Sequence, residues 1–169
     1  MTGTRKKITV GLLGAFVLIG FYALSAGRLV LNGTRSLPHT GYLMVSWPIL
    51  PLRGSYVAFP SPHAVDARFQ DFPFVKQIVG LPGDMIISSD AQVCVAGTCR
   101  TLLPKLAEKG LKPLSEGVVE ADELVVFGDA PDSLDSRYAL IGTVARSDIL
   151  AVGYPVPIPH WTEWNAWAQ

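Results

Sequence analysis

A run of 20 residues without a charged side chain, Ile8–Gly27, lies near the N-terminus and sets the outline of the whole chain. At 1.5 Å per residue, a helix of this length spans the roughly 30 Å hydrocarbon core of a bilayer. The sequence therefore predicts a transmembrane helix over 8–27, preceded by a short tail over 1–7. The alternative is a secretory signal peptide, because Ala23–Ala26 offers the small residues of a cleavage site.

Basic residues are unevenly placed around this run. Arg5, Lys6 and Lys7 precede it, and Arg28 alone follows it directly. Because positive residues are retained on the cytoplasmic side, we expect a cytoplasmic N-terminus and a single-pass protein of the cell inner membrane. The outer domain, 28–159, is then periplasmic.

The outer domain is rich in residues that interrupt regular structure: the chain holds 16 glycines and 13 prolines. These residues separate short apolar segments and leave no long amphipathic helical pattern, which predicts a mainly β fold. We expect a solvated loop or short helix over 103–116. The expected strands are near 42–47, 55–60, 72–80, 85–89, 118–129 and 142–156, with a hairpin over 92–101.

Two cysteines, Cys94 and Cys99, stand in the segment VCVAGTCR. If Ala96 and Gly97 form a two-residue turn, the cysteines face each other as a non-hydrogen-bonded pair with Cα atoms about 4.5 Å apart. That separation suits a disulfide, and a disulfide suits an oxidising compartment beyond the membrane. Two free thiols in a loop are the alternative. No further cysteine or nearby histidine completes a metal ligand set.

Charge and the C-terminal tail give information on partners. The formal net charge is zero and the basic cluster lies at the N-terminus, so we expect no nucleic-acid partner. In the tail, 160–169, Trp161, Trp164 and Trp167 share one face of a helix. Tryptophan favours the membrane interface, so membrane lipid is an expected partner, with core packing as the alternative.

One lysine differs from the others in its surroundings. Lys105, Lys109 and Lys112 lie in the polar segment, whereas strand alternation sets Lys76 on one face with apolar neighbours. Burial lowers the pKa of a lysine, and a neutral amine can act as a general base. The alternative is a lysine whose charged end reaches solvent from an edge strand.

A base of this kind would serve a serine hydroxyl, which is unreactive until its proton is removed. The segment NGTRSLPHTGY offers Ser36, followed by Pro38 and Gly41, with Thr34 two residues upstream. In an extended segment the Thr34 hydroxyl projects to the same side as Ser36 and can serve as an oxyanion donor. A plain turn and loop is the alternative interpretation.

Three segments together resemble the membrane-bound type I signal peptidases, which use a Ser-Lys dyad. TRSLPHT resembles their nucleophile box, FVKQIVGLPGD their lysine box, and GDAPDSLDSRYALIG their third box. The resemblance implies a serine endopeptidase with a signal-peptidase-like β domain, Ser36 as nucleophile and Lys76 as general base. It also implies that Ser133 hydrogen-bonds the lysine amine, that Asp135 pairs with Arg137, and that neither a cofactor nor a metal is needed.

The nucleophile segment also resembles that of TraF-type conjugative-transfer peptidases, which process a pilin precursor and in some cases join its new ends into a ring. We therefore expect a precursor protein as substrate, with maturation or cyclisation of a conjugative pilin as the first hypothesis. Pilus or type IV secretion components are the further partners that this hypothesis implies. A general type I signal peptidase acting on preproteins is the second hypothesis. A structural subunit of a secretion or pilus assembly, without enzymatic activity, is the third.

Overall fold

The computed structural model describes residues 11–18, 20, 27–33, 36–46, 50–62 and 72–156. Residues 11–18 and 20 are helical. Within these ranges no helix combines the length and the apolar character needed to cross a membrane. The segments predicted over 1–7 and 160–169 lie outside the described residues, as does much of the run 8–27.

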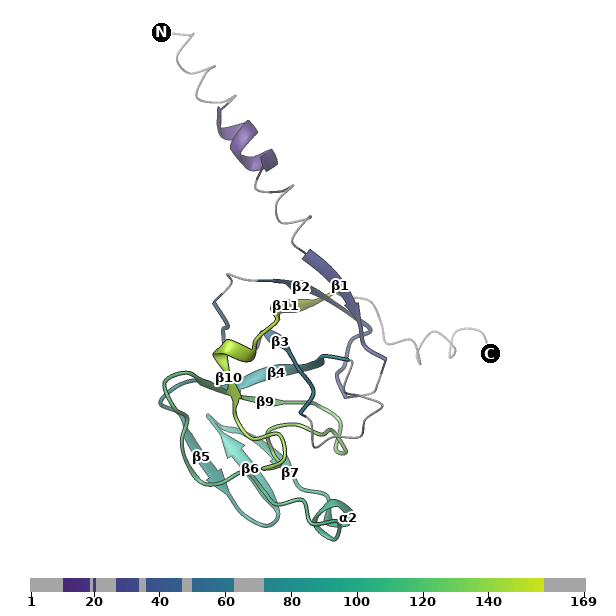
Figure 1. Ribbon diagram of the computed structural model, residues 1–169, viewed down its shortest axis with the longest axis vertical. Helices are drawn as coiled ribbons and strands as arrows, with labels where there is room; N and C mark the ends of the chain where they lie inside the picture. The colour runs from purple at the N-terminus through teal and green to yellow at the C-terminus, as the bar shows by residue number, and fades with distance from the viewer. Residues whose placement is uncertain are drawn as a thin grey trace, which may run out of the picture.

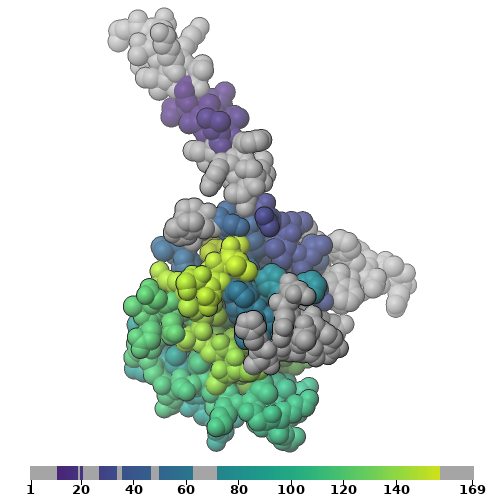
Figure 2. All heavy atoms as spheres, viewed as in Figure 1, coloured from purple at the N-terminus to yellow at the C-terminus, as the bar shows by residue number. Residues whose placement is uncertain are grey.

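Two antiparallel sheets make up the domain, and Figure 1 shows the larger one nearer the N-terminal segment. Its strand order is β1-β2-β11-β3-β4-β9-β10. In Figure 2 the last strand in sequence, β11, lies against strands from the first third of the chain, as this order requires. The bounds are β1 Gly27–Leu31, β2 Gly41–Val45, β3 Tyr56–Phe59, β4 Phe74–Gly80, β9 Glu123–Phe127, β10 Val144–Ala145 and β11 Ala151–Val156.

The smaller sheet has the order β7-β6-β5-β8 and lies at the other end of the domain (Figure 1). A four-residue helix, α2 (Pro104–Ala107), follows β7 in the segment where we expected a loop or short helix. The strand bounds are β5 Met85–Ser88, β6 Gln92–Val95, β7 Thr98–Thr101 and β8 Gly117–Val118.

The mainly β prediction is confirmed, but three details of it were wrong. The segment 118–129 is two strands in different sheets, because the chain turns at 121–122 with the Glu123 amide donating to the Glu120 carbonyl. The segment 142–156 is interrupted by a 3-10 turn, Arg146–Asp148, between β10 and β11. Strand β1 was not expected, because its residues continue the apolar run that precedes them.

The core is organised around β9, whose side chains are buried on both faces. Leu124 and Val126 pack with one apolar cluster, and Val125 and Phe127 pack with the other, which lines the smaller sheet. A Cβ atom at Gly80 would lie 2.7 Å from the Val125 Cβ. Glycine is therefore required where β4 passes closest to β9.

The segment Leu81-Pro82-Gly83-Asp84 carries the chain from the large sheet to the small one. The Asp84 amide donates to the Leu81 carbonyl over 3.0 Å, which closes a tight turn. Pro82 fixes the second position of this turn, and Gly83 takes a φ of +87° at the third, which glycine adopts without strain. The Leu81-Pro82-Gly83-Asp84 part of the lysine box therefore has a structural role, which is to form this turn.

The predicted disulfide hairpin is confirmed. Cys94 and Cys99 are register partners in β6 and β7, are joined by a disulfide, and have Cα atoms 4.0 Å apart. Ala96 and Gly97 have φ angles of 49° and 82°, the left-handed pair that a two-residue hairpin turn requires.

Replacing both cysteines by serine should lower the free energy of unfolding by about 2 kcal/mol, because the unfolded chain loses a short cross-link. Denaturant unfolding of the purified full chain measures this. Reductant should lower the stability of the wild type to that of the double variant and leave the variant unchanged. Equal stability of both proteins would show that the hairpin needs no covalent closure.

Candidate active site

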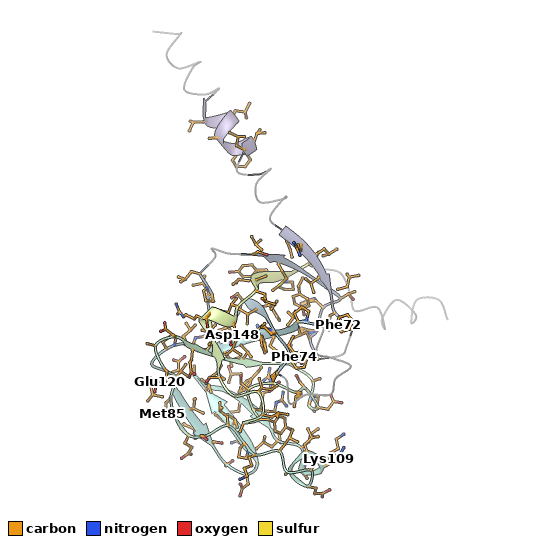
Figure 3. All side chains as sticks on the ribbon, viewed as in Figure 1. Phe72, Phe74, Met85, Lys109, Glu120 and Asp148 are labelled. Carbon is orange, nitrogen blue, oxygen red and sulfur yellow. A yellow bond between two sulfur atoms is a disulfide. The ribbon has the colours of Figure 1, made fainter. Side chains whose placement is uncertain are left out.

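Lys76 lies in β4, in the interior of the large sheet, and is 5% exposed. Its Nζ lies 5.7 Å from the centroid of the Phe74 ring. Burial lowers the pKa of Lys76 from 10.5 to about 8, although the nearby Asp135 carboxylate opposes this shift. Figure 3 shows Phe74, two residues earlier, near the middle of the domain, and Lys109 of the polar segment at its far end.

The Lys76 amine donates a hydrogen bond to Ser133 Oγ over 2.9 Å. Ser133 is itself 3% exposed and follows β9 in a tight loop, where its amide donates to the Ala130 carbonyl over 3.1 Å. One N–H of the amine is therefore held in a fixed direction. A neutral amine held in this way has its lone pair directed elsewhere, which a general base requires.

An ion pair between Asp135 and Arg137 holds the loop that carries Ser133. Arg137 Nε donates to Asp135 Oδ1 over 2.8 Å and Nη2 donates to Oδ2 over 2.9 Å, so the pair is bidentate. Both side chains are buried, at 0% and 1% exposure. The remaining Arg137 donors bind the backbone carbonyls of Gly128, Ala130, Pro131 and Thr101.

Ser36 belongs to the connection between β1 and β2. Its carbonyl accepts hydrogen bonds from the amides of Asp129 and Ala130, over 2.8 and 3.4 Å. The next residue, Leu37, is 2% exposed and packs with an apolar cluster of β2 and β3. Asn32 closes the connection, because its side chain donates to the Leu37 carbonyl over 3.2 Å.

Gly128 is the residue at which these groups come together. Gln77 pairs with Phe127 at the end of β9, so the following glycine lies beside Lys76. A Cβ atom at Gly128 would overlap Ser133 Oγ and would lie 2.8 Å from the Ser36 carbonyl oxygen. The Ser133 side chain and the Ser36 backbone carbonyl therefore approach the same glycine from two segments that are far apart in sequence.

The structure thus brings together Ser36, Lys76, Ser133, Asp135 and Arg137 around the end of β9. Thr34, the expected oxyanion donor, lies outside the described residues. Cys94 and Cys99 belong to the hairpin of the small sheet. In the part of the chain that the structure describes, no group of three or more His, Cys, Asp or Glu side chains could hold a metal ion.

Sequence reasoning missed two tyrosines beside the Ser36 segment. The rings of Tyr42 and Tyr56 lie 4.7 Å apart, and the His39 amide donates to the Tyr42 hydroxyl over 3.2 Å. Burial raises the pKa of both phenols, and the Asp129 carboxylate adds to the shift, so both stay neutral. A tyrosine directly after Gly41 was the only signal for this contact in the sequence.

A buried amine with a lowered pKa that donates to one serine, beside a glycine that also meets the carbonyl of a second serine, is the arrangement expected of a serine peptidase with a lysine base. The sequence matches the family described as signal peptidase, peptidase S26, over residues 2–154, and the chain belongs to this family of serine peptidases. It is also similar to the crystal structure of a signal peptidase I from Enterococcus faecalis V583. That similarity has 23% identity and a TM-score of 0.39, and covers 63% of this chain and 98% of that chain. No curated protein matches the chain.

We expect one lysine of the folded protein to titrate near pH 8, because Lys76 loses its hydration on folding. Carbon-13 NMR of labelled lysines measures this, and Lys76→Met assigns the signal. Since the unfolded chain holds this proton up to about pH 10.4, stability should rise between pH 8 and that value. A Lys76 signal that titrates with the exposed lysines would contradict the burial argument.

Gly128→Ala should destabilise the fold by about 1–3 kcal/mol, because the new methyl group displaces Ser133 and the Ser36 carbonyl. Gly33→Ala is the matched control, since a Cβ atom there has no neighbour within 4 Å. Thermal unfolding of the two variants measures the difference. Equal melting temperatures would mean that the loop after β9 yields without strain.

Proposed function

We propose that the chain is a membrane-anchored serine endopeptidase that cleaves membrane-inserted precursor proteins, with Ser36 as the nucleophile and Lys76 as the general base. Family membership supports a peptidase that acts on precursor proteins. The observation that carries the residue assignment is the meeting at Gly128. The Ser133 hydroxyl accepts a hydrogen bond from the Lys76 amine. This hydroxyl and the Ser36 carbonyl both lie so close to Gly128 that a Cβ atom there would clash with them.

In the proposed reaction, neutral Lys76 removes the proton from Ser36 Oγ as this oxygen attacks the scissile carbonyl carbon. The Ser36 amide and the Thr34 hydroxyl stabilise the negative oxygen of the tetrahedral intermediate. The ammonium of Lys76 then gives its proton to the leaving amine, and an acyl-enzyme on Ser36 remains. Lys76 next takes a proton from a water, or from an amine of the substrate in the cyclising case, as this group attacks the acyl carbon. The ester bond to Ser36 Oγ then breaks, and the Lys76 ammonium returns the proton to Ser36 Oγ.

The remaining residues of the site are assigned supporting roles. Ser133 accepts one N–H of Lys76 and so directs the lone pair of the amine. Asp135 accepts from the Gly128 amide over 2.7 Å as well as from Arg137, and thereby fixes the loop on which Ser133 stands. Such support is needed because a reacting group about 1 Å out of place can slow a reaction roughly 10²-fold.

We place the catalytic domain in the periplasm beside the inner membrane, with 8–27 as the anchor and the N-terminus in the cytoplasm. Strand β1 begins at Gly27, and Ser36 follows it by a short connection. An exposed apolar face runs across the neighbouring strands β1, β2 and β11, where register sets Leu29 beside Leu43 and Leu43 beside Tyr154. These three side chains are 50–57% exposed, which favours contact with lipid.

For the substrate we propose a conjugative pilin precursor, cleaved and in the cyclising case joined end to end. The order of residues in the nucleophile segment supports this choice. Pilus or type IV secretion components are the partners that such a reaction implies. A general signal peptidase is the second candidate, favoured by the third box and by Thr40.

A structural subunit without activity is disfavoured by the energetics of the buried lysine. Lowering the pKa of Lys76 from 10.5 to about 8 means that its charged form destabilises the fold by about 3 kcal/mol below pH 8. A leucine or methionine in this position of β4 would carry no such penalty. A catalytic role for the amine explains why a lysine occupies this position despite its cost in stability.

Ser36→Ala and Lys76→Ala should each lower precursor processing by roughly 10³-fold or more, because either change removes a group that makes or breaks bonds. A co-expressed pilin precursor, followed by intact mass, measures this. Lys109→Ala is the matched control, since this lysine lies in the polar segment after α2. A product lighter by one further water indicates cyclisation, and full processing by Ser36→Ala contradicts the mechanism.

The two substrate hypotheses are separated by offering the purified enzyme the pilin precursor and several unrelated preproteins. We expect cleavage of the pilin precursor alone. Cleavage of the preproteins at comparable rates would favour the general signal peptidase.

A further inference from the structure

The disulfide hairpin of the small sheet reaches the candidate active site through Arg100. This arginine follows Cys99 in β7, and its guanidinium extends to the loop after β9. Nε donates to the Gly128 carbonyl over 3.0 Å, and Nη2 donates to Asp129 Oδ1 over 2.7 Å. The guanidinium also lies 6.0 Å from the centroid of the Phe127 ring. It therefore contacts three successive residues at the point where β9 ends.

Asp129 links this arginine to the proposed nucleophile. Its carboxylate accepts from Arg100, and its amide donates to the Ser36 carbonyl over 2.8 Å. The Arg100 contact and the Ser36 contact thus belong to one residue, the first through its side chain and the second through its amide. Any displacement of Asp129 moves the group that holds the Ser36 backbone.

The buried ion pair does not replace this contact. Arg137 holds the carbonyls of Gly128 and Ala130, and Asp135 holds the Gly128 amide. No hydrogen bond that the structure records within the described residues runs from Arg137 to the Asp129 side chain. Among the residues that the structure describes, Arg100 is the one cation recorded to pair with that carboxylate, whose side chain is 40% exposed.

Strand β7, which carries Arg100, is fixed to the small sheet by strand pairing and by the disulfide. Strand β7 is an edge strand, paired only with β6, and Arg100 lies opposite Val93, which is fully buried. The disulfide joins the two strands one residue before Arg100. The guanidinium is therefore anchored to the core of the small sheet while its donors hold a loop of the large sheet.

We infer that Arg100 is a positioning residue for the peptidase reaction, and that it acts on Ser36 through Asp129. The inference rests on the proposed function, since it assumes Ser36 to be the nucleophile. Arg100 contacts neither Ser36 nor Lys76 and does not take part in bond making. Its role is to keep the Asp129 amide directed at the Ser36 carbonyl, so that the hydroxyl stays within reach of the amine.

The test uses the purified full chain and a fluorogenic peptide copied from the cleavage site that the intact-mass experiment maps. Arg100→Ala should lower kcat about 10- to 100-fold and leave KM within about twofold, because misplacement affects the reaction more than binding. Arg100→Lys should restore part of kcat, since lysine keeps the charge but loses the two-donor geometry. A kcat of Arg100→Ala equal to that of the wild type overturns the inference.

Arg53→Ala is the matched control for a general loss of stability. Arg53 also binds a carboxylate, Asp84 over 2.7 Å, and a backbone carbonyl, that of Val79, but at the turn between the sheets. Melting temperatures of the Arg100 and Arg53 variants should fall to a similar extent, whereas kcat should fall only for Arg100→Ala. An equal fall of kcat in both variants would mean that Arg100 acts only through stability, which overturns the inference.

Asp129→Ala provides a second route that does not depend on how well Arg100→Ala folds. It keeps the amide that binds Ser36 and removes the carboxylate that binds Arg100. We expect a similar loss of kcat, and the same loss in the double variant, because both changes break one connection. Additive losses overturn the inference.

Ser36→Ala in the same assay separates this inference from the proposed function. Full activity of Ser36→Ala would remove the nucleophile assignment and the inference with it. An inactive Ser36→Ala beside a fully active Arg100→Ala would leave the proposed function standing and overturn only the role of Arg100.

Discussion

The structure depends on keeping a primary amine out of water. An ammonium group is strongly hydrated, so burying Lys76 is unfavourable unless the amine becomes neutral or finds partners. The fold meets this demand with an interior strand, an aromatic ring on one side and, among the described residues, the Ser133 hydroxyl as recorded hydrogen-bond partner. Burial outweighs the nearby Asp135 carboxylate, so the pKa falls to about 8. More acceptors around the amine would have kept its pKa nearer 10.5 and left a much smaller neutral fraction to take a proton.

The loop after β9 is the second constraint, and its design differs from that of the lysine. Asp135 and Arg137 are fully buried, yet every direction of the guanidinium is matched by a carboxylate or a carbonyl oxygen. Because desolvation offsets much of the attraction in such a pair, its contribution is better understood as geometry than as net stability. The pair binds five backbone groups of one loop, which are three carbonyls and two amides, and one carbonyl of β7, that of Thr101. Position 128, where that loop meets the Ser36 segment and Ser133, has room for glycine and for no larger residue.

Local pattern was sufficient for part of this architecture. Alternation in FVKQIVG predicted that Lys76 shares a face with apolar residues, and the spacing of Cys94 and Cys99 predicted their pairing, since both depend on neighbours in sequence. The turn that divides 118–129 was missed because it contains neither glycine nor proline, and β1 was missed because it continues an apolar run. The roles of Ser133, Asp135 and Arg137 came from the family resemblance rather than from local pattern. Arg100 gave no signal at all, because its partners lie 28 and 29 residues away and an arginine in a short strand is ordinary.

Ser36 and Lys76 stand on parts of the sheet that differ in how firmly they are held. Lys76 belongs to β4, which has a strand on each side, whereas Ser36 follows β1, an edge strand bonded on one side to β2. The Ser36 segment is held instead by the Asp129 and Ala130 amides, which donate to the Ser36 carbonyl, and by the burial of Leu37. The two groups of the proposed dyad are therefore supported by different parts of the large sheet. Ser36 lies next to an edge strand, and Lys76 lies on an interior strand three positions further along the sheet order from β2.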